Sequence, residues 1–413
     1  MLIISIICFL ILLILLFLGL RKNTDFLSPG RVFAMLWAFV LGVVELKLSR
    51  LQLEWSALDW FMALIGLVTF LIGIYISYIL NLGKPFLQIS EIRTKLREVQ
   101  IDESRLFKFI VIYFFLCLAS FIIEWRIEGY IPLFTARPDK ARVMFGIFGL
   151  NYILNSINAV MFLIIQYFIF IKAKVVKKSF LVVIFILSLG NYILFVQRFG
   201  MFILLMMGFC IYYYAGKRLK LRTVVIFAAL ILSLLIGIQS LRVTKFYTDY
   251  VYLGSKMKFS PQYSEFTVPY MYVAMNIENF VKYYPHIEKH SFGFFTFEYL
   301  VELSTIRKWF IDYYHFDKFK LHIGGYNTFP FFWTYFYDFG IAGLAVIPFI
   351  IGFTISEIYY YLHRNPGLIV LTLTAIAFTI ITSSFNSDSL TRLDTVLPFF
   401  VIVGSQFYFQ KKP

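Results

Sequence analysis

Long uncharged apolar runs, separated by short polar segments, follow one another along almost the whole chain. The first, residues 2–20, contains 19 residues without a charge, and a membrane-spanning helix needs roughly 17 to 25 predominantly apolar residues. No small-residue cleavage site follows it, so we predict an uncleaved first span and not a signal peptide. The apolar runs predict spans at residues 2–20, 31–48, 57–80, 106–123, 150–171, 180–197, 199–215, 223–241, 336–361, 367–383 and 395–409.

The composition supports this pattern. The 413 residues are 60% hydrophobic and 20% aromatic, with a mean hydropathy of +0.80, whereas a soluble domain is roughly 45 to 50% apolar. We therefore predict an all-α fold, a polytopic integral membrane helical bundle of about 11 transmembrane helices with one large outer loop. Helices 1 to 8 are expected in residues 1–241, the large loop in 242–330 and helices 9 to 11 in 331–413.

The distribution of lysine and arginine predicts the orientation, because cytoplasmic loops of membrane proteins carry an excess of these residues. With the N-terminus outside, the inner segments hold 20 of the 38 basic residues and the short outer segments hold 8. The other 10 lie in the long outer loop, where the rule loses force. We therefore predict an outer N-terminus and an inner C-terminus, with Lys411 and Lys412 inside.

The segment IPLFTARPDKARVMFG, residues 131–146, departs from this rule because it carries several basic residues on the outer side. Pro138 predicts the first position of a helix. On that helix Asp139 and Arg142 are three residues apart, so one interpretation is a local ion pair. The alternative is an anion site formed by Arg137 and Arg142, since a guanidinium binds phosphate oxygens in bidentate fashion and keeps its charge.

Two further arginines are expected at the outer membrane face. Arg198 lies in the short turn QRFG, and Arg242 lies at the end of the eighth predicted span. Isolated interfacial arginines usually extend to lipid headgroups. Taken with Arg137 and Arg142, however, they favour a site for a lipid-linked phosphate or diphosphate.

A stripe of amide side chains runs along the fifth predicted span. Asn151, Asn155 and Asn158 are spaced i, i+4 and i+7, and Gln166 continues the same face. Such a stripe is expected to face the bundle interior. It indicates either interhelical hydrogen bonds, worth about 1 kcal/mol or less each, or the wall of a polar cavity.

The large loop holds most of the groups suited to acid–base chemistry. Four of the five histidines lie there, together with eight carboxylates, and histidine titrates near neutral pH, which suits a general base. Its aromatic stretch, residues 290–316, predicts an interfacial helix that lies on the membrane as a lid. The candidates for a catalytic base are His290, His315, His322 and Glu298.

Several site types have no pattern in the sequence. It contains no glycine-rich phosphate loop, no HExxH motif and no paired-cysteine metal signature. We therefore expect no metal, no cofactor and no nucleic-acid partner. Acidic and basic residues are nearly lacking within the predicted spans, which disfavours ion-coupled transport.

Three stretches carry a resemblance to a known family: IPLF…RPDKARVMFG, NIENFVKYYP and GGYNTFPFFWTYFYDFGIAGLAVIPFIIGF. With the layout of the whole chain, they resemble the Wzy-type oligosaccharide repeat unit polymerases, the O-antigen or capsule polymerases of bacterial inner membranes. Some members carry an R-x10-G pattern. It is not met here, because Gly149 follows Arg137 one residue too late.

The resemblance implies a metal-independent membrane glycosyltransferase of polysaccharide biosynthesis, without a cofactor. It would transfer the growing glycan from undecaprenyl diphosphate to a new lipid-linked repeat unit on the periplasmic face. Its partners would be the undecaprenyl-diphosphate-linked oligosaccharide, membrane lipid, a chain-length regulator and a flippase. Four arginines would bind the diphosphate: Arg137, Arg142, Arg198 and Arg242.

Two other functions fit the same pattern. An O-antigen ligase uses the same donor with lipid A core as acceptor, and has an outer loop with arginine and histidine. A flippase or exporter of lipid-linked sugar belongs to another class. It usually has more spans, internal repeats and charged residues within the bundle, which this sequence does not show.

Overall fold

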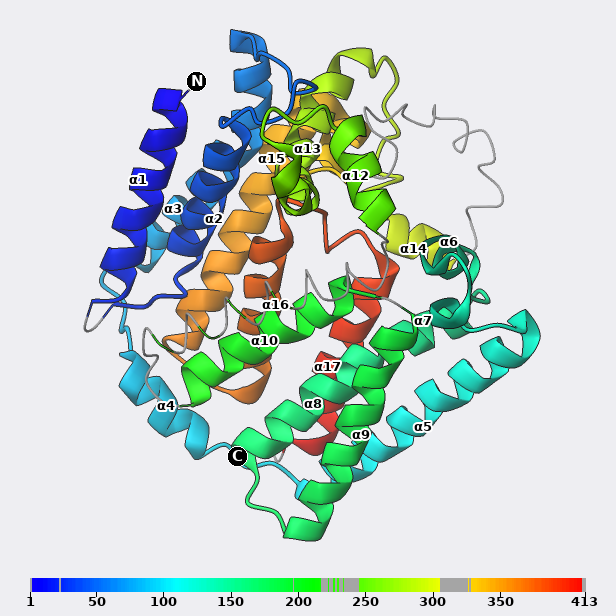
Figure 1. The fold of residues 1–413 in the computed structure, drawn as a ribbon. Coiled ribbons are helices and arrows are strands. Elements are labelled where there is room, and N and C mark those ends of the chain that lie inside the picture. The colour runs from blue at the N-terminus through cyan, green and yellow to red at the C-terminus, as the bar shows by residue number, and fades with distance from the viewer. Residues whose placement is uncertain are drawn as a thin grey trace. The chain divides into compact units, whose positions relative to one another are not determined.

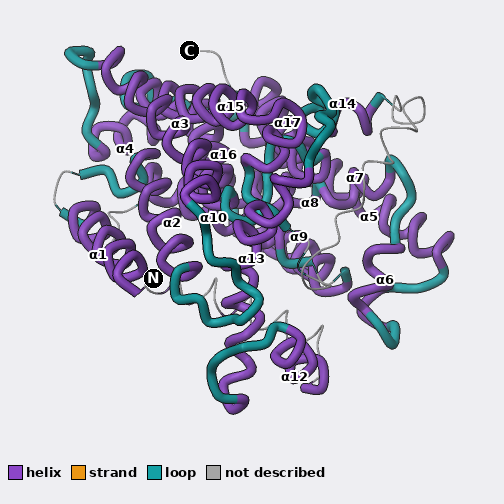
Figure 2. The backbone as a smooth tube through the Cα atoms, turned by 90° about the horizontal axis from the view of Figure 1, so that it is seen from above, coloured by secondary structure: helices purple, strands orange, loops and turns teal. Residues whose placement is uncertain are grey.

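The structure is a computed structural model that describes residues 2–21, 24–195, 197–216, 245–304 and 328–410, Tyr326 and a few isolated positions between 217 and 244. Over these residues the chain forms helices and no strands, apart from two isolated bridges (Figure 2). This confirms the predicted all-α class. The number of eleven spans and the side on which the large loop lies stay predictions.

Within the described part of the chain, six helices are long and apolar enough to cross a membrane, so the protein is membrane-embedded. Four more predicted spans form shorter apolar helices, and the eighth, at 223–241, lies almost wholly outside the described residues. The six are Leu2–Gly19, Ala57–Asn81, Glu103–Phe134, Leu150–Phe170, Val175–Leu194 and Phe332–Leu362.

The chain divides into two compact units, which cut across the predicted segments 1–241, 242–330 and 331–413. Figure 1 labels their helices. The first comprises Met1–Pro85, Lys245–Tyr360 and Ile380–Leu393. Its helices are α1 (Leu2–Gly19), α2 (Pro29–Val44), α3 (Ala57–Asn81), α12 (Lys245–Gly254), α13 (Thr267–Tyr283), α14 (Glu298–Leu303) and most of α15 (Phe332–Leu362).

The second unit comprises Phe86–Thr244, Tyr361–Thr379 and Asp394–Pro413. Its helices are α4 (Ile89–Arg97), α5 (Glu103–Glu128), α6 (Pro138–Met144), α7 (Leu150–Asn155), α8 (Ile157–Phe170), α9 (Val175–Leu194), α10 (Phe199–Ala215) and most of α16 (Leu368–Ser383) and α17 (Leu393–Phe409). A short 3-10 turn, η1 (Pro132–Phe134), precedes α6.

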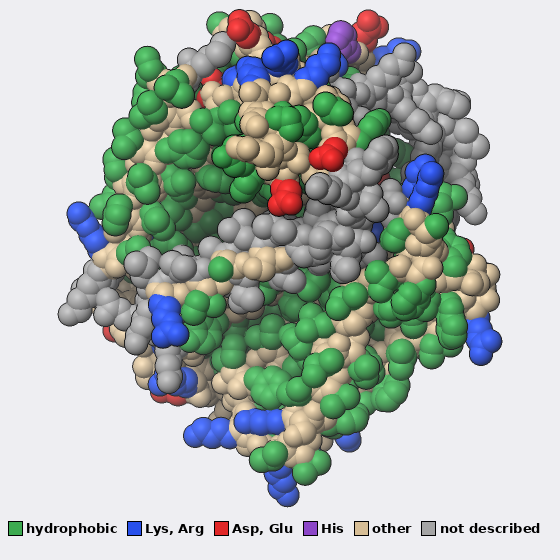
Figure 3. Space-filling model, viewed as in Figure 1, with side chains coloured by type: hydrophobic (Ala, Val, Ile, Leu, Met, Phe, Trp, Pro, Cys, Tyr) green, Lys and Arg blue, Asp and Glu red, His purple; other side chains and the backbone are tan. Residues whose placement is uncertain are grey.

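In the first unit, small residues allow close contact between helices. Ser5 Oγ on α1 donates a hydrogen bond to the Gly42 carbonyl oxygen on α2 at 2.7 Å. Where α3 crosses α15, a Cβ atom on Gly73 would lie 2.2 Å from the Phe349 carbonyl oxygen, so only glycine fits there. The other faces of α1 are exposed and apolar, as the green side chains at the left of Figure 3 show, which suits contact with lipid.

In the second unit, segments that the charge pattern assigns to the inner side meet at one end. The Leu87 amide donates to the His363 carbonyl oxygen at 2.8 Å, and Lys177 pairs with Glu103 at 2.8 Å. Basic side chains gather below the ends of α8 and α9 in Figure 3.

The fifth predicted span, 150–171, which corresponds to the apolar segment Leu150–Phe170, is interrupted within its length. It divides into α7 and α8 at Ser156. The Ser156 hydroxyl bonds to the Ile153 carbonyl oxygen at 2.6 Å and to the Tyr113 hydroxyl at 2.7 Å. A serine side chain that bonds to nearby backbone competes with the helical ladder, which explains the interruption.

The large loop contains a helix that the lid interpretation did not anticipate. Of the 17 residues of α13, 13 are buried, and this helix packs against α2 and α3. The polar residues of NIENF therefore lie inside the first unit. Residues 305–325, which include the later part of the predicted lid (305–316), lie outside the described residues.

Candidate functional site

Arg137 and Arg142 lie at the two ends of α6 in the second unit. The helix begins at Pro138, as the sequence predicts, because proline suits the first helical position. Arg137 precedes it with an exposed side chain, and Arg142 is half-buried in its last turn. The side chain of Asp139, the alternative partner of Arg142, lies outside what the structure describes.

An aromatic contact brings the segments of Arg142 and Arg198 to the same end of this unit. The rings of Phe145 and Phe195 lie 4.9 Å apart and form a small core with Leu154. Phe145 follows Arg142 by three residues, and Phe195 precedes Arg198 by three. Two of the predicted diphosphate-binding arginines therefore come from neighbouring segments.

A chain of amide side chains continues from the same end. Asn155 Nδ2 donates to Asn151 Oδ1 at 3.0 Å, and Gln197 Nε2 donates to Asn155 Oδ1 at 2.8 Å. We call Asn151, Asn155 and Gln197 the amide chain. The sequence analysis missed Gln197, although its place beside Arg198 in QRFG was a usable signal.

The deeper members of the asparagine stripe form hydrogen bonds between helices. Buried Asn158 accepts a hydrogen bond from the Tyr192 hydroxyl of α9. Buried Gln166 donates to Thr372 Oγ1 of α16 at 2.9 Å. The interhelical interpretation therefore accounts for these two residues.

Three candidates, Arg242, His315 and His322, lie outside the described residues. His290 and Glu298 are described, and both belong to the first unit. Glu298 is half-buried at the first position of α14.

The His290 imidazole is held in one orientation. Its Nδ1 lies 3.1 Å from the Tyr337 carbonyl oxygen. A carbonyl oxygen only accepts, so Nδ1 carries the hydrogen, and the neutral ring then keeps a lone pair on Nε2. The half-buried ring also meets the Phe336 ring edge-on, with centroids 6.0 Å apart.

A break in α15 provides the acceptors for this segment. Gly340 has φ 62° and ψ −145°, which glycine adopts far more readily than other residues. In a continuous helix these carbonyl groups would accept hydrogen bonds from later backbone amides of the same helix. The break leaves them available to other donors. The Ser291 amide donates to the Tyr337 carbonyl oxygen at 3.4 Å, and the Phe292 amide donates to the Asp338 carbonyl oxygen at 3.1 Å.

The Asp338 side chain fixes the turn that follows His290. Its fully buried carboxylate accepts hydrogen bonds from Ser291 Oγ, from the Phe295 amide at 3.2 Å and from the Thr296 amide at 2.5 Å. The pattern YDFG thus has a structural role. It fastens the segment that starts with His290 to the beginning of α15.

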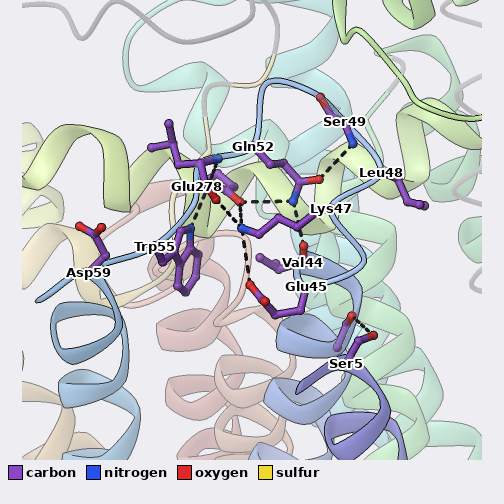
Figure 4. Close-up of polar contacts among 12 residues, drawn as sticks. Ser5, Val44, Glu45, Lys47, Leu48, Ser49, Gln52, Trp55, Asp59 and Glu278 are labelled. Carbon is purple, nitrogen blue, oxygen red and sulfur yellow. Dashed lines mark hydrogen bonds and ion pairs between the residues drawn. The ribbon is translucent and has the colours of Figure 1, made fainter. Parts of the chain in front are cut away.

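A second buried carboxylate, Glu278 on α13, organises the loop between α2 and α3 (Figure 4). Lys47 Nζ lies 2.8 Å from Oε1, and Gln52 Nε2 donates to the same oxygen at 3.2 Å. The Leu53 amide at 3.1 Å and Trp55 Nε1 at 3.2 Å donate to Oε2. The sequence analysis missed this cluster, because Lys47 and Glu278 are 231 residues apart.

Two tyrosines beside this cluster remain donors at neutral pH. Burial raises the pKa of Tyr270, whose hydroxyl donates to Gln52 Oε1 at 2.5 Å. Burial and the hydrogen bond to Asp59 raise the pKa of Tyr284 to about 12. Both phenols therefore stay protonated. Tyr270 holds the loop at Gln52, and Tyr284 holds the first turn of α3 at Asp59.

Among the described residues, no three His, Cys, Asp or Glu side chains come together in a way that would hold a metal ion. Comparison of the chain with protein-family models, with curated proteins and with solved structures gave no match. Function must therefore be argued from the residues.

Each unit carries candidate chemistry of its own. In the second unit, arginines and the amide chain supply donors for phosphate oxygens and for sugar hydroxyls. In the first unit, His290 supplies a nitrogen lone pair on a ring that the backbone orients.

Proposed function

We propose that the protein is a membrane glycosyltransferase that polymerises undecaprenyl-diphosphate-linked oligosaccharide repeat units. In this proposal it lies in the bacterial inner membrane with its N-terminus in the periplasm and its C-terminus in the cytoplasm. The growing glycan would pass to a new lipid-linked repeat unit on the periplasmic face. The resemblance of the RPDKARVMFG and YDFG stretches to Wzy-type polymerases supports the reaction class.

The observation that carries the proposal is the arginine end of the second unit. Arg137 is exposed beside α6, and the contact of Phe145 with Phe195 brings the segments of Arg142 and Arg198 together. Guanidinium groups fixed by short packed segments suit the oxygens of a diphosphate. The amide chain at the same end offers further donors and acceptors for sugar hydroxyls.

The chemistry needs a stabilised leaving group and a base. Cleavage of the bond between the anomeric carbon and the diphosphate places negative charge on the diphosphate, which preorganised cations stabilise. The acceptor hydroxyl forms the new bond to the anomeric carbon and gives its proton to a base. We assign the diphosphate to Arg137, Arg142 and Arg198, and the base to His290. The cleaved bond supplies the energy, so no nucleotide is required.

Alanine substitution at Arg137 or Arg142 tests the proposal. Each variant should lower the rate of chain extension roughly a hundredfold to a thousandfold, because one donor to the developing charge is lost. Lysine at either position should recover little, since an ammonium lacks the bidentate fork. The measurement is the glycan ladder of cells that carry each variant, at matched protein level.

Lys140 on the same helix is the matched control, because its side chain is also basic and exposed. Lys140→Ala should leave the ladder unchanged. If Asp139→Ala harms extension as much as Arg142→Ala and lysine is tolerated, the local ion pair is the correct account. Normal ladders in both arginine variants would refute the proposal. Loss of glycan transfer to lipid A core, with chain extension unchanged, would indicate a ligase instead.

A further inference from the structure

The break of α15 at Gly340 creates a support for one histidine. A helix amide normally donates to the carbonyl four residues earlier, and the non-helical backbone of Gly340 interrupts that series. The carbonyl oxygens of Tyr337 and Asp338, just before the break, accept from the segment that contains His290. The break therefore provides a binding surface for that segment.

Gly340 also leaves room for the imidazole. A Cβ atom at this position would lie 3.0 Å from His290 Nε2 and 3.2 Å from its Cε1. Any side chain here would press on the nitrogen that keeps the lone pair. Glycine thus serves both the backbone conformation of the break and the space that the imidazole occupies.

Asp338 holds the other side of the same turn. Its carboxylate accepts three hydrogen bonds from residues 291–296, two of them from backbone amides. An amide side chain has one oxygen and one NH2 group, so asparagine would not accept all three. The charge and the shape of Asp338 are both needed to keep His290 against the Tyr337 carbonyl.

We propose that Asp338 and Gly340 are positioning residues, which hold the neutral His290 imidazole with hydrogen on Nδ1 and so present Nε2 as the base for the acceptor sugar hydroxyl. This inference rests on the proposed function. In the step, the Nε2 lone pair takes the hydroxyl proton while the hydroxyl oxygen bonds to the anomeric carbon. The anomeric carbon–oxygen bond to the diphosphate breaks, and its electron pair leaves with the diphosphate. His290 becomes a cation and then releases the proton to solvent.

Nitrogen-15 NMR of the full chain in lipid nanodiscs, with labelled histidine, tests the positioning directly. His290→Gln identifies the signal of His290 among the five histidines. The wild-type protein at a pH where the ring is neutral should show hydrogen on Nδ1, which is the minor form of free neutral histidine. Hydrogen on Nε2 in the wild-type protein would overturn the inference. This measurement needs no variant that might misfold.

Activity measurements complete the test. Asp338→Asn should move the His290 hydrogen towards Nε2 and lower kcat of chain extension tenfold to a hundredfold, with KM nearly unchanged. Asp338→Glu should restore part of the hydrogen on Nδ1 and part of kcat, because it returns the carboxylate. Asp249 is an exposed acid of α12 and provides the matched control. Asp249→Asn should change neither the His290 tautomer nor kcat.

The two proposals fail in different ways. A wild-type rate in His290→Gln, or a loss of rate in Asp338→Asn without a change of tautomer, would overturn the positioning role. Failure of the wild-type protein to extend a lipid-linked oligosaccharide would refute the proposed function. The NMR spectrum would still decide how His290 is held.

Discussion

Two carboxylates of the first unit and two arginines of the second are placed in opposite ways. In the first unit, Glu278 and Asp338 are fully buried and accept four and three hydrogen bonds. In the second unit, Arg137 is exposed, and Arg142 is half-buried at the end of a seven-residue helix. A buried carboxylate with all its partners fixes one loop conformation, whereas an exposed guanidinium is accessible to a ligand.

This contrast separates stability from activity. Removal of a buried, paired charge leaves its partners buried without a counterpart, which destabilises the fold. Removal of an exposed charge changes stability little, typically within about 0.5 kcal/mol. Substitution of Glu278 should therefore act mainly on folding, and substitutions at the arginine end of the second unit mainly on activity.

The largest expected effect on stability is at Glu278. Glu278→Ala leaves the Lys47 ammonium buried, and loss of one partner of a buried ion pair costs about 3 to 5 kcal/mol. Glu45 lies 3.5 Å from the same ammonium and still balances part of its charge in the variant. We therefore expect a cost at the lower end of that range. The measurement is thermal unfolding of the purified protein in detergent.

Two controls sharpen this prediction. Glu288→Ala removes an exposed acid from the same unit and should leave the unfolding temperature unchanged. Arg137→Ala should also unfold at the wild-type temperature while it abolishes chain extension. If Glu278→Ala, Glu288→Ala and Arg137→Ala lowered the unfolding temperature equally, the distinction between a buried structural carboxylate and exposed charges would be wrong.

A smaller effect is expected from Asp388, in the loop between α16 and α17. It is 5% exposed, and burial raises the pKa of Asp388 to about 6, although hydrogen bonds from Tyr335 and the Leu390 amide act in the opposite direction. The native state therefore binds this proton more tightly than the unfolded chain. The stabilisation is complete below the ordinary pKa of 3.8 and is lost as pH rises through about 6.

The difference between a pKa of about 6 and one of 3.8 corresponds to roughly 3 kcal/mol as an upper figure. Unfolding temperatures at pH 4 and pH 7.5 should therefore differ more in the wild-type protein than in Asp388→Asn, whose side chain does not titrate. A variant with the same pH dependence as the wild-type protein would show that this carboxyl does not contribute.

The sequence predicted those features of the fold that depend on local pattern. Apolar runs located the helices, because hydropathy over about 20 residues is a local property. Pro138 marked the start of α6 for the same kind of reason. The division between α7 and α8 escaped prediction, since it depends on Ser156 and on a hydroxyl from another helix, Tyr113.

The candidate site was predictable only in part. Arginines in a loop that is predicted to lie outside stood out against the charge rule, and the spacing of Asn151 and Asn155 indicated their contact. The roles of Glu278 and Asp338 did not stand out, because their partners are distant in sequence. A single sequence shows which residues are unusual, but not which distant donors a buried carboxylate meets.

The smallest of the three expected effects compares one glycine from each unit. Gly73→Ala places a Cβ atom 2.2 Å from the Phe349 carbonyl oxygen, so α3 and α15 must separate, at a cost of about 1 to 3 kcal/mol. Gly190, on α9 of the second unit, has open space around its Cα. Gly190→Ala should therefore be neutral or stabilise by up to about 1 kcal/mol, because alanine favours the helix. Unfolding temperatures in detergent measure both. If the two substitutions shift stability equally, the close contact of α3 with α15 does not hold the first unit together.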